Sequence, residues 1–203
     1  MSAEALPERI AALRQYRVAI AVPDQTSQYR TLQAIAKDIL ARKDVLNDAN
    51  LLALLMGCLR GLSDPEASAT SGTCVVLNSC IATRGGELLP QVKVLTNGLL
   101  LAMNGLSDQQ SLNGTLHAVR TLASHHLLPV INTLLERPLP YGQHAVRALQ
   151  VLAKDASLQD RLLEHLTDLV NNGQLYDDMD NSQNSSSTRA AQSTTQRVPN
   201  ALA

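Results

Sequence analysis

The tetrapeptide Gly-Leu-Ser-Asp occurs twice in this chain, at residues 61–64 and again 44 residues later at 105–108. A second marker, Leu-Leu-Pro, occurs at 88–90 and 39 residues later at 127–129. Repeats of this length are typical of stacked pairs of antiparallel helices, whose period is about 40–47 residues. One pair cannot cover its own apolar face, so neighbouring pairs must stack to form a continuous core.

Apolar residues between the markers recur at steps of three and four positions, the spacing of amphipathic helices. No segment alternates apolar and polar residues for long enough to predict a strand. The chain is 45% hydrophobic but only 2% aromatic, so Leu, Val, Ile and Ala must build the core, and this composition favours helices over sheets. We therefore predict an all-α, HEAT/armadillo-like α-solenoid of antiparallel helix pairs.

The expected pairs are helices 47–62 with 65–84, 89–106 with 108–125, and 128–136 with 141–153, followed by a last helix at 158–170. The sequence suggests three parts. Residues 1–46 form N-terminal helices whose packing it leaves open, the first ending near Pro23. Residues 47–172 form the repeat domain, and 173–203 are too poor in large aliphatic residues to order, which predicts a disordered tail.

Short polar motifs mark the expected helix ends. Three serines, each followed three residues later by a polar side chain, fit the capping box at a helix start: Ser63 with Glu66, Ser107 with Gln110, and Ser157 with Asp160. Pro90 and Pro129 suit an early helical position, where the missing N–H costs nothing. Residues 85–86, both glycine, predict a helix stop.

Composition argues against several classes of function. A net charge of −1, from 17 basic and 18 acidic residues, provides no footprint for nucleic acid. The apolar stretches fall short of the ~20 residues of a membrane span, so no direct membrane insertion is expected. With no export signal in view, the three cysteines (Cys58, Cys74, Cys80) are expected to be reduced and buried, which predicts a cytoplasmic location, with a nuclear one as the alternative.

Candidate chemistry is sparse. The Ser-Asp pairs at 63–64 and 107–108 lack the surroundings of a nucleophile and are better explained as caps. The five histidines lack metal-ligand spacing, so no catalytic, cofactor-binding or metal-binding residue is predicted. A hydrolase site formed only in three dimensions, from Ser63 or Ser107 and a histidine, remains a remote alternative. The tetrapeptide His-Ala-Val-Arg at 117–120 and 144–147 makes Arg120 and Arg147 candidates to bind a partner's carboxylate, or else to stay solvated.

Four blocks of residues resemble the Maestro HEAT-like repeat family: 84–88 (Arg-Gly-Gly-Glu-Leu), 122–126 (Leu-Ala-Ser-His-His), 134–140 (Leu-Leu-Glu-Arg-Pro-Leu-Pro) and 147–149 (Arg-Ala-Leu). The resemblance covers about residues 45–172. Members of this family are generally much larger helical-repeat proteins without a known active site, so the resemblance implies an intracellular binding role and no enzyme activity. We expect a scaffold for a protein partner. An adaptor in a membrane-trafficking, endolysosomal complex is the alternative.

Overall fold

The computed structural model describes residues 11–41, 48–63, 69–136 and 141–171. Every regular element in these ranges is helical, as the sequence predicts: α2 (Ala11–Ile20), α3 (Gln25–Ala41), α4 (Asp48–Ser63), α5 (Thr70–Arg84), the 3-10 turns η2 (Gly85–Glu87) and η3 (Leu89–Gln91), α6 (Val92–Gly105), α7 (Gln109–Leu135), α8 (Gln143–Ala153) and α9 (Ala156–Asn171). The predicted tail at 173–203 lies outside the described residues. Two compact units divide the chain, residues 1–159 and 160–203.

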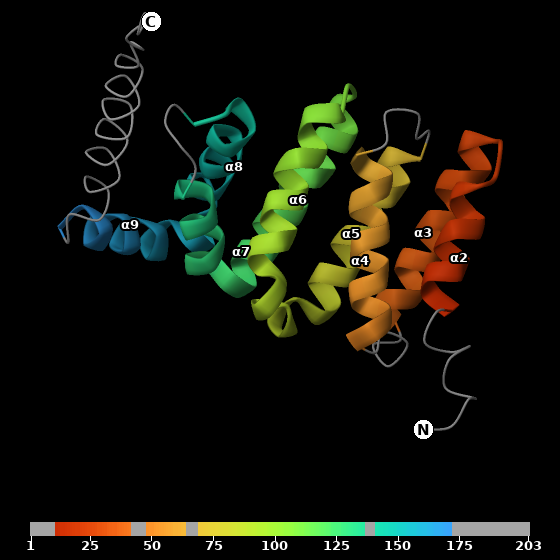
Figure 1. The fold of residues 1–203 in the computed structure, drawn as a ribbon, viewed down its shortest axis with the longest axis horizontal. Helices are drawn as coiled ribbons and strands as arrows, with labels where there is room; N and C mark the ends of the chain where they lie inside the picture. The colour runs from red at the N-terminus through yellow and green to blue at the C-terminus, as the bar shows by residue number, and fades with distance from the viewer. Residues whose placement is uncertain (1–10, 42–47, 64–68, 137–140, 172–203) are drawn as a thin grey trace, which may run out of the picture. The chain divides into compact units, whose positions relative to one another are not determined.

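The helices of the first unit form two layers (Figure 1). Helices α2, α4, α6 and α8 make the first layer, and α3, α5 and α7 make the second. Each helix contacts the next helix of its own layer and the partner of its hairpin. The expected pairs α4 with α5 and α6 with α7 are present, and α2 with α3 adds a hairpin that packs on them. The repeat stack therefore reaches further toward the N-terminus than residue 47.

Helix α7 contains a sharp bend where two separate helices, 108–125 and 128–136, were expected. His126 has non-helical backbone angles (φ −137°, ψ 59°), so Gln109–Leu135 consists of two arms joined without a loop. Pro129 begins the second arm, where its missing N–H is tolerated. The sequence located the break correctly but did not reveal that the arms are continuous.

Aspartates, rather than the predicted serines, cap the helix starts. The carboxylate of Asp108 accepts a hydrogen bond from the Ser111 amide at 2.7 Å, so the cap of α7 lies one residue after Ser107. A carboxylate at this position also interacts favourably with the positive end of the helix dipole. Ser107 and Asp108 are adjacent, and both residue types cap well. The interaction with the dipole explains why Asp108 is the cap. The predicted box of Ser107 with Gln110 is wrong.

The predicted box of Ser157 with Asp160 is also wrong, whereas the box of Ser63 with Glu66 falls partly outside the described residues. Ser63 is the last residue of α4, and its hydroxyl donates to the Leu59 carbonyl oxygen; its expected partner Glu66 lies outside the described residues. At the start of α9, Asp155 accepts hydrogen bonds from the Ser157 amide and hydroxyl, so Ser157 lies inside the helix instead of capping it.

Glycines inside the helices allow close packing between neighbouring helices of one layer. A methyl group at Gly72 of α5 would lie 2.6 Å from Cδ1 of Leu32 in α3, and one at Gly114 of α7 would lie 2.8 Å from Cβ of Cys74 in α5. In the first layer, Gly98 meets Leu59 in the same way. We call these contacts seams. Glycine in a helix interior costs up to about 1 kcal/mol relative to alanine. These positions carry glycine despite that cost because a side chain would clash with the neighbouring helix.

Candidate binding surface

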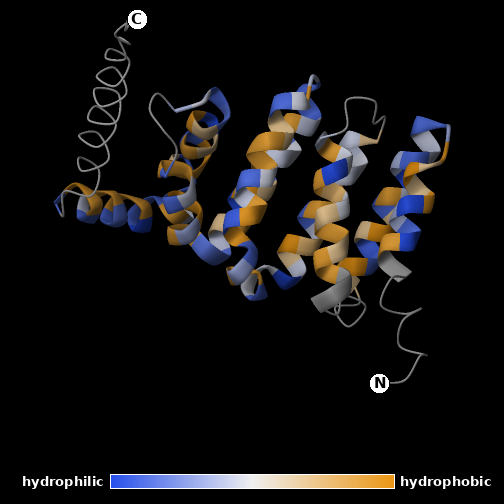
Figure 2. Ribbon diagram, viewed as in Figure 1, coloured by the Kyte–Doolittle hydropathy of each residue, from blue (hydrophilic) through white to orange (hydrophobic). Residues whose placement is uncertain are grey.

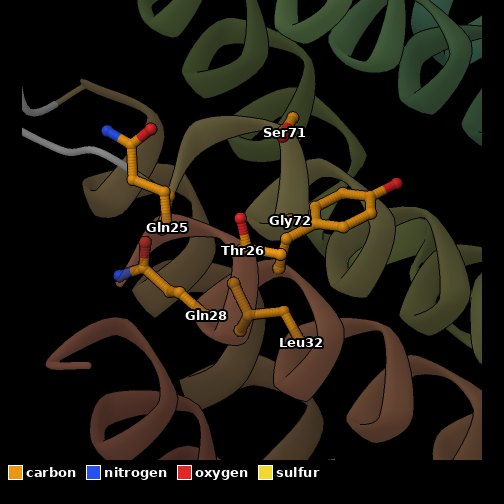
Figure 3. Close-up of a pocket in the computed structure, with 8 residues that line it drawn as sticks. Gln25, Thr26, Gln28, Leu32, Ser71 and Gly72 are labelled. Carbon is orange, nitrogen blue, oxygen red and sulfur yellow. The ribbon is translucent and has the colours of Figure 1, made fainter. Parts of the chain in front are cut away.

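Among the residues that the structure describes, two hollows on the surface of the second layer are both lined by Ser71 of α5. The first has a volume of about 300 Å³ and lies between α3 and the start of α5. In Figure 3, Gln25, Thr26 and Gln28 border it on the α3 side. The remaining lining residues are Tyr29, Leu32, Ala69 and Gly72. Because Gly72 and Leu32 both line this hollow, its wall includes the contact that brings α3 and α5 together.

The base of this first hollow is rigid. Gln28 is only 2% exposed, and its amide nitrogen donates to the carbonyl oxygen of Ile20 at the end of α2. A buried amide with its hydrogen bond made holds one geometry. Because Gln25 and Thr26 at the rim are exposed, they remain available to contact a ligand.

The second hollow, of about 380 Å³, lies across α3, α5 and α7. Its lining is small and largely apolar: Leu40, Ser71, Cys74, Val75, Asn78, Ser79, Ala82, Gln110, Gly114 and His117. Leu40 is 51% exposed at its edge. This lining contains no Asp, Glu, Lys or Arg side chain, so it suits a ligand that is itself uncharged where it enters.

Asn78 organises this second hollow. Its amide nitrogen donates to the Cys74 carbonyl oxygen at 2.8 Å and to the Gly114 carbonyl oxygen at 2.9 Å, which joins α5 to α7. Its oxygen is 2.8 Å from Nδ1 of His117. Since the amide oxygen only accepts, Nδ1 must carry the proton. Each of these polar groups is therefore fixed before any ligand binds.

The cysteines are not activated for chemistry. Cys58, Cys74 and Cys80 are buried free thiols. Burial raises the pKa of Cys74 to about 11 and that of Cys80 to about 12, so both thiols stay protonated at neutral pH. Across residues 11–41, 48–63, 69–136 and 141–171, no three His, Cys, Asp or Glu side chains gather as metal ligands would.

The two candidate arginines lie in different environments. Arg120 of α7 donates from Nε to Asp155, whose side chain is only 7% exposed. The hydrogen bonds from Ser157 and then the Arg120 guanidinium lower the pKa of Asp155 to about 2. Arg147 is half-buried in α8. Arg120 thus helps to anchor the corner before α9, and binding of a partner by Arg120 or Arg147 stays a prediction.

Two of the four blocks that resemble the known family, 84–88 and 122–126, meet at one corner of the stack. Arg84 and Glu87 form an ion pair across η2. Nε2 of His126, at the bend of α7, donates to the carbonyl oxygen of Gly85 at 2.7 Å. The ring of His125 lies against Gly85 so closely that no side chain fits there. The sequence predicts Gly85 as a helix stop. The structure shows in addition that glycine is required there because any side chain would collide with His125.

The profile of the family described as "Maestro, HEAT repeats" matches residues 3–163. The chain belongs to this family. The Maestro match begins well before residue 45, so it includes α2 and α3, which the resemblance in the sequence had left out. It also accounts for the described architecture of helix hairpins.

Among curated Maestro heat-like repeat-containing proteins, the chain is 44% identical over 124 residues to family member 1 of Dictyostelium discoideum, covering 61% of this chain and 8% of that protein. It is 29% identical over 143 residues to the Mus musculus member, covering 70% and 8%, and 27% identical over 141 residues to the Homo sapiens member, also covering 70% and 8%. The chain thus matches about a twelfth of the length of these relatives. No solved structure matches it.

No helix in the described ranges combines the length and apolar character needed to cross a bilayer.

Proposed function

We propose that this chain is a non-catalytic scaffold for protein–protein interaction, and that its second layer binds a short segment of a partner along α5. The observation that carries this proposal is the pair of hollows sharing Ser71, which together extend over α3, α5 and α7. Repeat stacks commonly bind through an extended surface of this kind. Membership of the Maestro HEAT-repeat family supports a scaffold in general, and the hollows support the placement of the proposed site on the second layer.

The chemistry of the lining defines the partner segment. Small residues such as Ser71, Ser79 and Ala82 allow a partner backbone to approach closely, while half-exposed Leu40 offers an apolar contact. Polar side chains at the rims provide hydrogen bonds without charge. The expected segment therefore places one or two aliphatic side chains in the second hollow and uncharged polar groups along the first.

Site-specific photo-crosslinking in cells tests this proposal. A photoreactive amino acid at Ser71 or at Ala82 should capture the same discrete partner, whereas one at exposed Asn104 on α6 should not. Substitution Ser71→Arg should abolish capture from Ala82, and the matched control Ser71→Ala should preserve it. Equal labelling from all three positions, or none from Ser71 and Ala82, would contradict the proposal.

A reducing compartment, cytoplasmic or nuclear, forms part of the proposal. Three buried free thiols support it, since disulfides are rare in such compartments. Fluorescence microscopy of a tagged full chain tests the location, and accumulation in a secretory compartment would overturn it.

A further inference from the structure

The outward face of the first layer exposes large apolar side chains from successive helices. Val18 of α2 is 70% exposed, Leu52 of α4 is 40%, and Val94 and Leu101 of α6 are 57% and 65%. Leu52, Met56 and Arg60 are four residues apart and so share one side of α4, and hydrophobic colours dominate this helix in Figure 2. Exposed apolar groups arranged across neighbouring helices mark a surface that another molecule covers.

The charges on this face have one sign. Within the part of α2, α4, α6 and α8 whose side chains the structure describes, the exposed charged residues are Arg14, Arg17, Arg60 and Lys93. Lys93 forms an ion pair with Glu136, which leaves three arginines on α2 and α4 as the unbalanced charges. This face therefore combines apolar and positive character, and it fits a surface that combines apolar and negative character.

Helix α9 presents such a surface. Asp160, Glu164 and Asp168 recur at intervals of four residues, so they lie along one side of the helix. Leu163 and Val170, 66% and 48% exposed, flank this row on the Asp160 side, and exposed Arg161 flanks it beside Asp168, so three carboxylates stand against one arginine; Leu162 is buried on the opposite side. Carboxylates spaced by one helical turn repel each other weakly, and an opposing set of arginines relieves this repulsion.

We infer that copies of this chain associate with one another, α9 of one copy docking on the outward face of the first layer of the next. The two surfaces match in both charge and apolar content, and each copy carries both of them. Because the two contacting surfaces differ, the contact is heterologous and extends into rings or open chains unless geometry closes it. This inference goes beyond the proposed function, because it uses α9 and the first layer and leaves the hollows of α3, α5 and α7 open.

Charge reversal with mutual rescue tests this inference in the full chain. Wild type should show concentration-dependent association in sedimentation equilibrium, weakening as salt rises. The pair Arg17→Glu and Arg60→Glu should weaken self-association by more than about tenfold, because like charges then oppose each other, and so should Glu164→Lys with Asp168→Lys. Mixing the two double variants should restore association, since the reversed first layer of one then complements the reversed α9 of the other.

Several results would overturn the inference: a wild type that stays monomeric at every concentration, association unchanged in both double variants, or no rescue on mixing. Binding of the wild-type monomer to phosphatidylserine vesicles in place of self-association would assign the basic, apolar face to a lipid surface instead. Circular dichroism checks folding. If a reversal unfolds the chain, the neutral variants Arg17→Gln and Arg60→Gln give the same test with a smaller effect.

Discussion

The seams and the corners of the stack hold its helices by different means. At the seams, within a layer, glycines such as Gly72 and Gly114 let a neighbouring side chain contact the helix backbone. At the corners, where the chain enters a new helix, carboxylates such as Asp108 and Asp155 bind exposed amide groups. The seams therefore depend on shape and should respond to a single added methyl group. The corners depend on hydrogen bonds and charge and should respond to acid.

The largest effect is expected at the seam between α5 and α7. Gly114→Ala would bring a methyl group 2.8 Å from Cβ of Cys74, an atom that cannot rotate away. We expect a loss of about 1–3 kcal/mol in the free energy of unfolding, the usual cost of overpacking. Urea denaturation measures it. The matched control is Gly105→Ala, whose methyl would meet nothing nearer than 3.9 Å. If the two variants were equally stable, glycines at seams would be no more sensitive to a methyl group than glycines elsewhere.

The seam between α4 and α6 should yield more easily. A methyl group at Gly98 would meet Cδ1 of Leu59 at 2.8 Å, and this atom is the end of a flexible side chain. Gly98→Ala should therefore cost less than Gly114→Ala. In the double variant with Leu59→Ala, the two losses should be non-additive by about 1 kcal/mol, because the clash disappears with the leucine. Strict additivity would show that these residues are not packed against each other.

At the corner before α7, Asp108→Ala should lower the free energy of unfolding by about 1 kcal/mol through loss of the helix cap. Ser107→Ala, which removes the residue that the sequence nominated, should change it by less than about 0.5 kcal/mol. Thermal unfolding of both variants distinguishes them. A larger loss of stability from Ser107→Ala than from Asp108→Ala would show that Ser107 is the cap, as the sequence predicts.

Acid should weaken the corner before α9. The folded pKa of Asp155 is about 2, held down by Ser157 and Arg120, whereas an unfolded aspartate titrates near ~3.9. This carboxylate therefore contributes stability that is complete above the unfolded pKa and is lost as pH falls through the folded value. The midpoint temperature of unfolding, measured from about pH 6 down to about pH 2, should fall less steeply for Asp155→Asn than for wild type. Parallel curves for the two proteins would contradict the assignment.

The smallest effect is expected at an open corner glycine. A methyl group added at Gly86, in η2, would have no heavy atom of another residue within 4 Å beyond its chain neighbours, and the backbone there is not left-handed. Gly86→Ala should stabilise the chain by about 0.4–1 kcal/mol, since it removes freedom only from the unfolded state. Differential scanning calorimetry would detect the rise in melting temperature. Destabilisation there would mean that corners are as closely packed as seams.

Periodicity and repeated markers were enough to predict the helices from residue 47 on, their pairing and the break near His126, whereas the packing of α2 with α3 was left open. The caps were misassigned because serine and aspartate stand side by side and both cap well. The seams went unnoticed because each glycine meets a residue from another unit. A signal does exist: Gly72 follows Leu32 by 40 residues, and Gly98 follows Leu59 by 39, close to the repeat spacing.

The hollows could not be predicted from the sequence. They arise from small side chains on three helices, and nothing in the local pattern distinguishes Ser71 or Ala82 from any other small helical residue. Arg120 was found as a candidate from its repeated tetrapeptide, but its partner Asp155 is 35 residues away and belongs to no motif. Only the folded arrangement shows that this arginine already has an acidic neighbour.

The seams also determine where this chain tolerates insertions and deletions. One residue inserted into a helix turns everything beyond it by about 100°, which would rotate a seam glycine away from its neighbour. Changes in length at a corner avoid this rotation, and the two marker spacings, 44 and 39 residues, show that the units differ in length. Residues 64–69 join α4 to α5 where only 106–108 join α6 to α7, and the turn Gly85–Glu87 has no counterpart at the bend of α7. Units of unequal length thus stack in one register, and loops can lengthen during evolution without separating the helices.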